Sequence, residues 1–285
     1  MQNQPKPAFP LQHQDVQPGI ESTMNPTPVY DNPAYRPANK LGGKTALITG
    51  GDSGIGRAIA VTFAKEGANL SIAYLNEDSD ANETVKLIQS IGVNVTKILA
   101  DLKNESEAAN AVKHTADAFG GLDILVNNAG VQYPQDSISD INREQLAHTF
   151  ESNIYSYFFA TKAALPHLKV GSAIINTASV VAFKGSERLI DYSATKGAIV
   201  AFTRSMAMSL VKQGIRVNAV APGPVWTPLI VSSFSAEEAA VFGTDTPMGR
   251  AAQPYELAPM YVFLANDDSS NITGQIFHVN SGEIV

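Results

Sequence analysis

The chain has 285 residues, of which 44% are hydrophobic and 16% charged, so it can build a large core and is not disordered throughout. Its 20 Lys and Arg stand against 27 Asp and Glu, a net charge of −7; an acidic surface repels phosphate groups, which disfavours nucleic acid as a partner. The sequence has no cysteine, which excludes disulfides and thiolate chemistry, and no apolar run reaches the roughly 18 residues of a membrane-spanning helix. The five histidines are scattered, so no catalytic metal is expected.

Residues 1–40 form a Pro/Gln-rich segment that holds 8 of the 16 prolines and no periodic apolar pattern. Proline fixes φ and lacks a backbone donor, so the segment is predicted to be extended. It is either a disordered tail or an arm that lies on the body or on a neighbouring subunit, and its aromatic residues Phe9, Tyr30 and Tyr35 favour the arm. It resembles neither a signal peptide nor a transit peptide, so a cytoplasmic location is expected.

From Lys44 onward, short apolar runs alternate with amphipathic stretches. The runs predict strands at 45–49, 70–75, 95–100, 123–126, 173–177, 216–220 and 275–279. The stretches predict a first helix that carries Ile55, Ile59 and Phe63, and further helices around 84–91, 105–119, 143–168, 191–212 and 255–264. This alternation indicates an α/β fold in which residues 41–285 form one Rossmann-like domain. Its doubly wound parallel sheet is expected to have about seven strands, with helices on both faces.

A glycine-rich turn, TGGDSGIG at residues 49–56, joins the first predicted strand to the first predicted helix. Glycines at such a turn let the backbone approach a pyrophosphate, whose charge is stabilised by the helix N-terminus. The Lys-Ser/Thr pair of nucleoside-triphosphate loops is missing, which disfavours ATP and GTP. The turn therefore predicts a dinucleotide site.

Tyr192 and Lys196 are four residues apart on a predicted helix, so they share one face of it. A tyrosine with a pKa near 10 is a poor base at neutral pH, but a nearby ammonium group favours the phenolate. Such a group could give or take the proton of an alcohol or carbonyl oxygen, and Ser179, just beyond the strand at 173–177, would hold that oxygen. A YxxxK match by itself is also compatible with an ordinary surface pair.

The motifs in chain order resemble those of the short-chain dehydrogenase/reductase family, in the subgroup with TGxxxGxG and YxxxK, over residues 41–285. They are TGGDSGIG, Asn127-Asn128-Ala129-Gly130, Asn153, Ser179, Tyr192-Ser193-Ala194-Thr195-Lys196 and Pro222-Gly223-Pro224-Val225-Trp226-Thr227. The arm and the glycine turn further resemble bacterial glucose/ribitol dehydrogenase-like general-stress oxidoreductases. The resemblance implies an NAD(P)-dependent oxidoreductase that transfers hydride between a nicotinamide and an alcohol or carbonyl substrate. It also implies a homotetramer that pairs through the helices at 143–168 and 191–212, where Tyr155, Phe158 and Phe159 would leave apolar surface.

The resemblance also implies a role for each site residue. Tyr192 would be the general acid/base, with Lys196 lowering its pKa and holding the nicotinamide ribose. Ser179 would polarise the substrate oxygen, and Asn153 would hold a water that links Lys196 to solvent. The cofactor-binding set would be Gly50, Asp52, Ser53, Gly54, Ile55, Gly56, Tyr74, Leu75, Asn76, Asp101, Leu102, Asn128, Ala129, Gly130, Tyr192, Lys196, Pro222, Gly223, Val225 and Thr227.

The choice between NAD and NADP depends on the second strand. Its end has no acidic residue to bind a ribose 2′-hydroxyl and no cation to bind a 2′-phosphate. Asp52 would repel a phosphate, and Asn76 could bond a neutral hydroxyl, so NAD is favoured and NADP is the alternative.

Two segments are expected to border the substrate, a small polyol, sugar, aldehyde or ketone. One is Val180–Ile190, with Lys184, Glu187 and Arg188; the other is a lid-like connection at 228–250, near Trp226, Phe234 and Phe242. Two other functions stay open: a dinucleotide-binding sensor or scaffold without turnover, and a dehydratase or epimerase on the same fold. The complete set of four catalytic residue types argues against the first.

Overall fold

The computed structural model describes residues 8–285, which contain one parallel sheet of seven strands in the order β3-β2-β1-β4-β5-β6-β7. The strands are β1 (Thr45–Thr49), β2 (Asn69–Tyr74), β3 (Val95–Leu99), β4 (Ile124–Asn127), β5 (Ala173–Thr177), β6 (Arg216–Pro222) and β7 (Ile276–Val279). Each strand pairs in parallel with its neighbours. The predicted fold class, a Rossmann-like doubly wound sheet, is confirmed.

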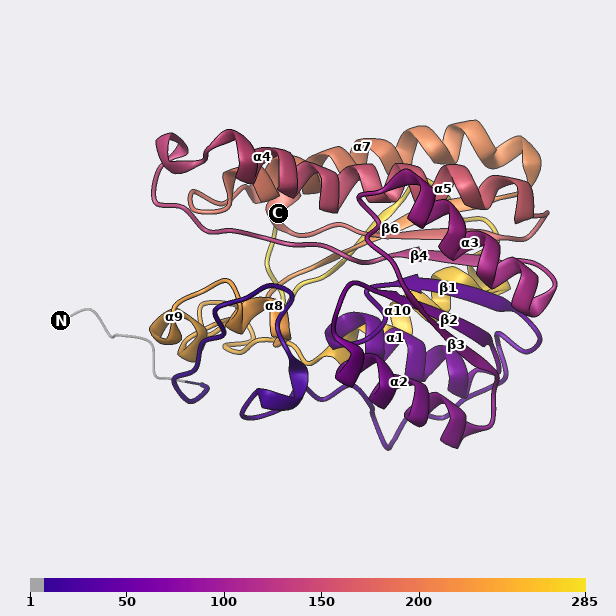
Figure 1. Cartoon of the computed structure of the whole chain (residues 1–285), viewed down its shortest axis with the longest axis horizontal. Coiled ribbons are helices and arrows are strands. Elements are labelled where there is room, and N and C mark those ends of the chain that lie inside the picture. Colours follow the sequence, from indigo (N-terminus) through magenta and orange to yellow (C-terminus); the bar gives the residue numbers. More distant parts are fainter. Residues whose placement is uncertain (1–7) are drawn as a thin grey trace.

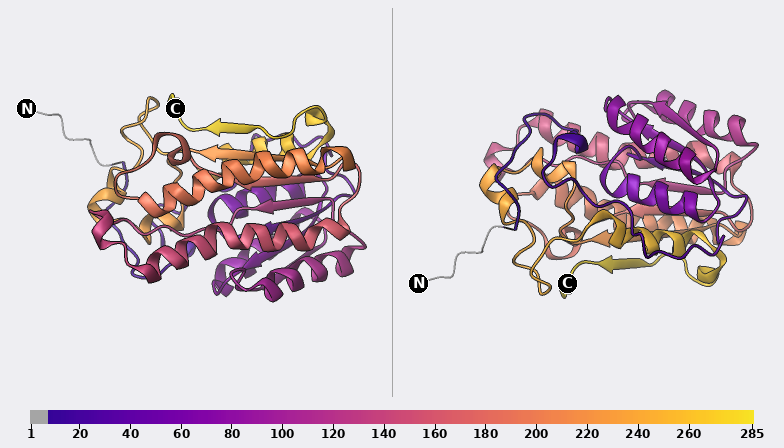
Figure 2. Two further views of the ribbon diagram at one scale, coloured as in Figure 1. Left: turned by 90° about the horizontal axis from the view of Figure 1, so that it is seen from above. Right: turned by 90° about the horizontal axis from the view of Figure 1, so that it is seen from below.

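Helices cover both faces of this sheet. They are α1 (Gly54–Lys65), α2 (Asp78–Ile91), α3 (Glu105–Phe119), α4 (Arg143–Phe150), α5 (Ser156–Ala164), α6 (Val181–Lys184), α7 (Ile190–Leu210), α8 (Pro228–Val231), α9 (Ala236–Ala240) and α10 (Pro254–Ala265). Helices α3, α4, α5 and α7 lie on one face, and α1, α2 and α10 lie on the other (Figures 1 and 2). The short helices α8 and α9 lie beyond the end to which the strands point, within the connection at 228–250.

The strand β1 has an apolar middle, Ala46–Ile48, between two buried threonines. Ile48 belongs to the core between the sheet and α1, whereas its neighbour Leu47 belongs to the core shared with α3 and α5. Successive side chains of a strand point to opposite faces, so a strand that is covered on both faces needs apolar residues at every position. All five residues of β1 are buried accordingly.

The predicted long helix at 143–168 contains an irregular turn. Between α4 and α5 the chain makes a π turn at Glu151–Tyr155, and after α5 it tightens into a 3-10 turn. Asn153 in the π turn is fully buried, while Tyr155 and Phe158 are 48% and 52% exposed. Phe159 was expected at the surface as well, but it is half-buried and packs against the core on the α3 side.

The described part of the arm, residues 8–40, lies against the body of its own chain. Figure 2 (right) shows it in indigo, crossing the end near α8 and α9 and then running along α10. The Phe9 ring stacks on Trp226 with 3.7 Å between ring centroids, and the Tyr35 hydroxyl donates a hydrogen bond to Glu66. The Arg57 guanidinium lies 5.6 Å from the centre of the Tyr30 ring. Residues 1–7 of the predicted arm lie outside the described residues.

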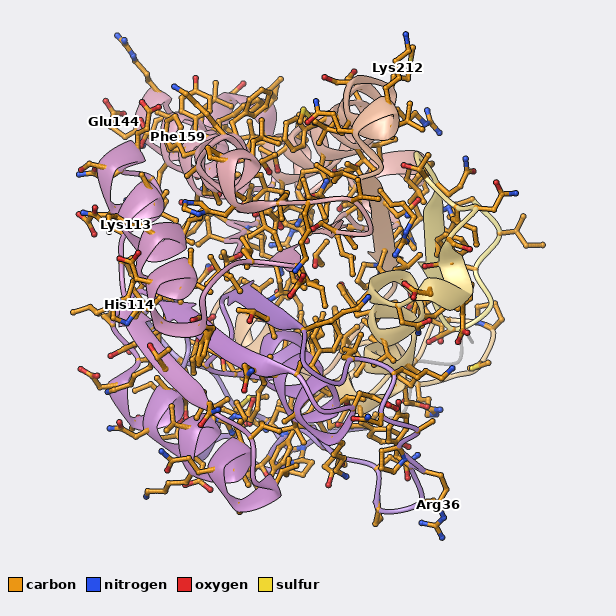
Figure 3. All side chains as sticks on the ribbon, turned by 90° about the vertical axis from the view of Figure 1, so that its right-hand side faces the viewer. Arg36, Lys113, His114, Glu144, Phe159 and Lys212 are labelled. Carbon is orange, nitrogen blue, oxygen red and sulfur yellow. The ribbon has the colours of Figure 1, made fainter. Side chains whose placement is uncertain are left out.

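The end of the molecule that lies away from α8 and α9 carries charged side chains. Figure 3 looks from that side, and Lys113 and His114 project outward from α3, as do Lys212 beyond α7 and Arg36 on the arm. None of the helices within residues 8–285 is both long and apolar enough to cross a membrane.

Candidate active site

Two cavities meet at the carboxyl ends of the strands, where the strand order reverses between β1 and β4. We call the first the glycine-turn cavity; it has a volume of about 250 Å³ and extends from the turn at 50–55 to the ends of β2, β3 and β4. The second, the tyrosine cavity, has a volume of about 680 Å³ and lies between Tyr192 and the segment around α8 and α9. Both are lined by Ile55, Asn128, Gly130, Thr227 and Leu229. Such a crevice is where open α/β sheets bind their ligands.

The glycine turn depends on glycine at specific positions. Gly54 has a φ of +51°, which other residues rarely adopt. A Cβ on Gly56 would lie 1.7 Å from the Gly50 carbonyl oxygen, so any side chain there would clash with the turn. The turn leads directly into α1, whose first backbone N–H groups lack partners within the helix. The Gly54 N–H donates to the Glu21 carboxylate at 2.6 Å, so an anion in the cavity would approach the N–H groups that follow it, from Ile55 onward.

Most of the predicted cofactor-binding residues line one of the two cavities. The glycine-turn cavity is lined by Gly50, Asp52, Ser53, Gly54, Ile55, Tyr74, Leu75, Asp101, Leu102, Asn128, Ala129, Gly130 and Thr227. The tyrosine cavity is lined by Ser179, Tyr192, Lys196, Pro222, Gly223 and Val225. Gly56 and Asn76 line neither cavity, and their contact with a cofactor stays a prediction. Gly56 packs behind the turn, and Asn76 is exposed, with its backbone N–H donating to Glu77 Oε2 at 3.0 Å.

Glu77 is a site residue that the sequence analysis missed. It lines the glycine-turn cavity, it is only 5% exposed, and its Oε1 has no hydrogen-bond partner within residues 8–285. Asp52 lines the same cavity, and burial together with the nearby charge of Glu77 raises the pKa of Asp52 to about 7. The only sequence signal is an acidic residue just before α2, three positions after the end of β2.

Tyr192, Lys196 and Ser179 come together in the tyrosine cavity. The Lys196 Nζ lies 5.3 Å from the centre of the Tyr192 ring and donates a hydrogen bond to the Thr177 carbonyl oxygen at 2.8 Å. Ser179 lines the same cavity, and its hydroxyl group acts to lower the pKa of Tyr192. Tyr192 and Lys196 are 9% and 3% exposed. The surface-pair interpretation of YxxxK is therefore wrong, because both side chains are buried at a cavity wall.

Burial dominates the protonation of this pair. It raises the pKa of Tyr192 to about 12, and the neighbouring Ser179 hydroxyl group opposes this rise. It lowers the pKa of Lys196 to about 7. A site with little water disfavours both charged forms. That Lys196 lowers the pKa of Tyr192 stays a prediction.

Asn153 holds the loop after β4 in place by hydrogen bonds. Its Oδ1 accepts from the Val131 N–H at 2.8 Å, and its Nδ2 donates to the Val131 carbonyl oxygen at 2.9 Å and to Thr195 at 3.1 Å. A Cβ on Gly130 would lie 3.2 Å from Asn153 Oδ1 and 3.7 Å from Lys196 Nζ. The Asn153 and Lys196 side chains therefore both face Gly130, and the role of Asn153 in holding a water that links the lysine to solvent stays a prediction.

Thr177, which the sequence analysis also missed, forms hydrogen bonds with Lys196 and with several side chains around it. Its carbonyl oxygen accepts from Lys196 and from the Tyr157 hydroxyl, at 2.8 and 3.3 Å. Its hydroxyl group lies 2.8 Å from the hydroxyl of Tyr261 and donates to Asn128 at 3.3 Å. Its place at the end of β5, two residues before Ser179, is the signal that could have pointed to it.

The far wall of the tyrosine cavity carries charge. Lys184 Nζ pairs with Glu283 Oε1 at 2.5 Å, and Glu283 Oε2 is buried with no hydrogen-bond partner within the described residues. Glu187 and Asp245 also line this cavity. A substrate here would meet mainly carboxylate acceptors.

Two residues expected at or near the substrate do not line the tyrosine cavity. Arg188 does not line the cavity, because it is paired with Asp136 and Glu238. Trp226 is fully buried beneath Phe9. Phe234 and Phe242 do line the tyrosine cavity, as expected. Within residues 8–285 no cluster of His, Asp and Glu is arranged to hold a metal ion.

Comparison with known proteins decides the family. Residues 50–283 match a family model described as Enoyl-(Acyl carrier protein) reductase. The chain is 58% identical to Uncharacterized oxidoreductase YhxC of Bacillus subtilis (strain 168), over 100% of this chain and 99% of the relative. The chain belongs to the short-chain dehydrogenase/reductase family. The predicted resemblance is thereby confirmed, and the protein is an oxidoreductase of a family that binds a nicotinamide cofactor.

Two further members of this family bear on the site. The chain is 52% identical to Glucose and ribitol dehydrogenase of Daucus carota, over 97% of each chain. The crystal structure of a short chain dehydrogenase from Burkholderia cenocepacia J2315 in complex with NADP has a TM-score of 0.81 and 32% identity, covering 85% of this chain and 98% of that one.

Proposed function

We propose that this protein transfers hydride between a nicotinamide cofactor and the alcohol or carbonyl group of a small polar substrate, with Tyr192 as general acid/base. One observation carries the proposal: Tyr192, Ser179 and Lys196 line one cavity that adjoins a glycine turn, and the Lys196 Nζ lies 5.3 Å from the centre of the Tyr192 ring. The reacting oxygen of a substrate in this cavity could reach both hydroxyl groups.

The residues of the glycine-turn cavity fit a dinucleotide. The start of α1 can accept a pyrophosphate, and the unpartnered Oε1 of Glu77 can accept hydrogen bonds from ribose hydroxyls. When bound, the nicotinamide supplies or accepts the hydride, and the protein supplies orientation and proton transfer.

Glu77 and Asp52 favour NAD over NADP. Both carboxyl groups line the glycine-turn cavity, and a 2′-phosphate near them would be repelled. NADP is the alternative, because the Burkholderia cenocepacia relative is in complex with NADP. Dissociation constants for NAD⁺ and NADP⁺, measured by calorimetry, test the preference.

The chain's own electrostatics favour reduction of a carbonyl group. With a pKa of about 12, Tyr192 is protonated at neutral pH and can donate its proton to a carbonyl oxygen, while Ser179 donates a hydrogen bond to the same oxygen. Lys196, with a pKa of about 7, is only partly charged near neutrality. Oxidation of an alcohol requires the phenolate and therefore additional positive charge close to the ring.

A polyol, sugar or aldehyde fits the tyrosine cavity. The free Glu283 oxygen, with Glu187 and Asp245, can accept hydrogen bonds from several hydroxyl groups, while Phe234 and Phe242 cover apolar surface. The relative from Daucus carota carries the name Glucose and ribitol dehydrogenase. A dehydratase or epimerase finds no such support.

The deciding experiment follows the absorbance of reduced nicotinamide with a panel of polyols, sugars and aldehydes. Wild-type turnover is expected with at least one pair of cofactor and substrate. Tyr192→Phe is expected to lower kcat by a factor of roughly 10² to 10⁴ while cofactor affinity stays within about twofold. Binding without turnover across the panel would instead favour a sensor or scaffold, and near-normal rates in the variant would refute the role of Tyr192.

Assembly as a homotetramer also stays a proposal. Tyr155, Phe158 and Met208 are 48%, 52% and 81% exposed on the π turn, α5 and α7, so this face offers apolar surface to a second copy. Light scattering measures the assembly directly. The cytoplasmic location stays a prediction as well.

A further inference from the structure

Three residues of the arm form part of the glycine-turn cavity. Gln17, Pro18 and Gly19 line it together with Ser53 and Ile55 of the turn. They precede the region of the family model, which starts at residue 50. The wall that they form is thus an addition to the part of the chain that defines the family.

Hydrogen bonds hold this wall in place. The Gln17 side chain donates to the Gln132 carbonyl oxygen at 2.6 Å and accepts from the Gln132 N–H at 3.2 Å, so it binds both backbone groups of a residue just beyond Gly130. Gln132 is 4% exposed. Gly19 packs directly against α8, because a Cβ there would lie 2.7 Å from the Pro228 carbonyl oxygen.

Glu21 connects the arm to the glycine turn itself. Its Oε2 accepts from the Gly54 N–H at 2.6 Å, its Oε1 pairs with Arg57, and its own N–H donates to Asp80 at 2.7 Å. Arg57 in turn donates from Nε to the Asp52 carbonyl oxygen at 2.9 Å. Glu21 is 2% exposed, and a buried carboxylate depends on such partners. The shape of the turn therefore depends on a residue of the arm.

We propose that the segment 17–21 is part of the dinucleotide site: Gln17, Pro18 and Gly19 form its outer wall, and Glu21 is a positioning residue for the turn that receives the pyrophosphate. The inference rests on the proposed function, since it assumes that a nicotinamide dinucleotide occupies the glycine-turn cavity. A wall that is ordered before binding contributes contacts without a cost of ordering, so it raises affinity and slows release of the ligand.

The experiment measures binding of NAD⁺ and NADP⁺ to the full chain by calorimetry, and release of NADH by stopped-flow fluorescence. The variants are Gln17→Ala, which removes both bonds to Gln132, and Glu21→Gln, which keeps an acceptor for Gly54 but removes the charge that faces Arg57. The matched control is Tyr35→Phe, which removes a hydrogen bond of the arm to Glu66, a residue that does not line the cavity. Thermal unfolding of every variant is recorded alongside.

We expect Gln17→Ala to weaken binding by at least about fivefold and to speed release. Glu21→Gln should weaken binding to a similar extent, whereas Tyr35→Phe should bind within about twofold of wild type even where its Tm falls. If wild type binds a dinucleotide and both arm variants bind it as tightly as the control, the arm only stabilises the fold. The inference is then overturned, while the proposed function stands. If wild type binds neither dinucleotide, the proposed function fails and the inference fails with it.

Discussion

The Lys196 Nζ lies 5.3 Å from the centre of the Tyr192 ring, yet its hydrogen bond goes to the Thr177 carbonyl oxygen. The two residues are thus neighbours, and burial is the main influence on the pKa of each. The same dry environment that raises the pKa of the phenol lowers the pKa of the amine. The protonation of the site is consequently open to change by any charge that enters it.

Lys196 should make the free energy of unfolding depend on pH. Its pKa is about 7 in the folded chain, against 10.5 for a lysine in water, so between these values the unfolded chain binds more protons. The unfolding free energy therefore rises as pH increases from 7 toward 10. Lys196→Met should flatten this rise. Urea unfolding at pH 7, 8 and 9 measures it, and an equal slope in both proteins would contradict the burial of a neutral amine.

Asp52 should make the free energy of unfolding change with pH in the opposite direction, and at lower pH. Its pKa is about 7 in the folded chain, against 3.8 for an aspartate in water, so in that interval the folded chain binds more protons. The unfolding free energy therefore falls as pH rises from 4 to 7. Asp52→Asn should remove this fall and be more stable than wild type at pH 7. Urea unfolding at pH 5 and pH 7 compares the two, with Asp136→Asn as an exposed control.

Glu77 should decide the choice of cofactor. Glu77→Gln removes a charge beside the proposed ribose site, so the affinity for NADP⁺ relative to NAD⁺ is expected to rise by about tenfold. Asn76→Ala, one residue away and outside both cavities, is the control and should leave the ratio unchanged. Calorimetry with both cofactors measures the ratio, and a shift of equal size in the control would place the specificity elsewhere.

Ser179→Ala should affect both rate and pH profile. Loss of the hydroxyl removes one donor to the substrate oxygen, which is expected to lower kcat by roughly tenfold to a hundredfold. Because the Ser179 hydroxyl group lowers the pKa of Tyr192, its removal should also move the rising limb of the pH profile of alcohol oxidation to higher pH. Steady-state rates across pH measure both effects. A lower kcat with an unmoved limb would mean that the serine contacts substrate but not the phenol.

Much of this architecture is readable from local sequence. The apolar strands, the glycine turn and the four-residue spacing of Tyr192 and Lys196 are short-range patterns, and each lies where the alternation of strands and helices predicts. Glu21 could not be placed in this way, because its partner Gly54 is 33 residues away and the contact depends on the path of an extended arm. The burial of Trp226 could not be predicted for the same reason: the residue that covers it, Phe9, comes from that arm.

The pKa values were beyond sequence reasoning for another reason. The spacing of Tyr192 and Lys196 predicts that they are close, but only the packing around them determines how much water remains. Glu77 was missed because the start of α2 turns it back toward the cavity, whereas Leu75, the residue directly after β2, is 38% exposed.

The π turn at Glu151–Tyr155 has a consequence for the evolution of this helix. It accommodates one residue more than a regular helix, and each residue rotates a helix by about 100°. Deleting a single residue there would produce a straighter and better-bonded helix, and would swing either Asn153 or Tyr157 out of its present direction. A regular helix here would therefore lose either the hydrogen bonds of Asn153 with Val131 or the hydrogen bond of Tyr157 with the carbonyl group of Thr177.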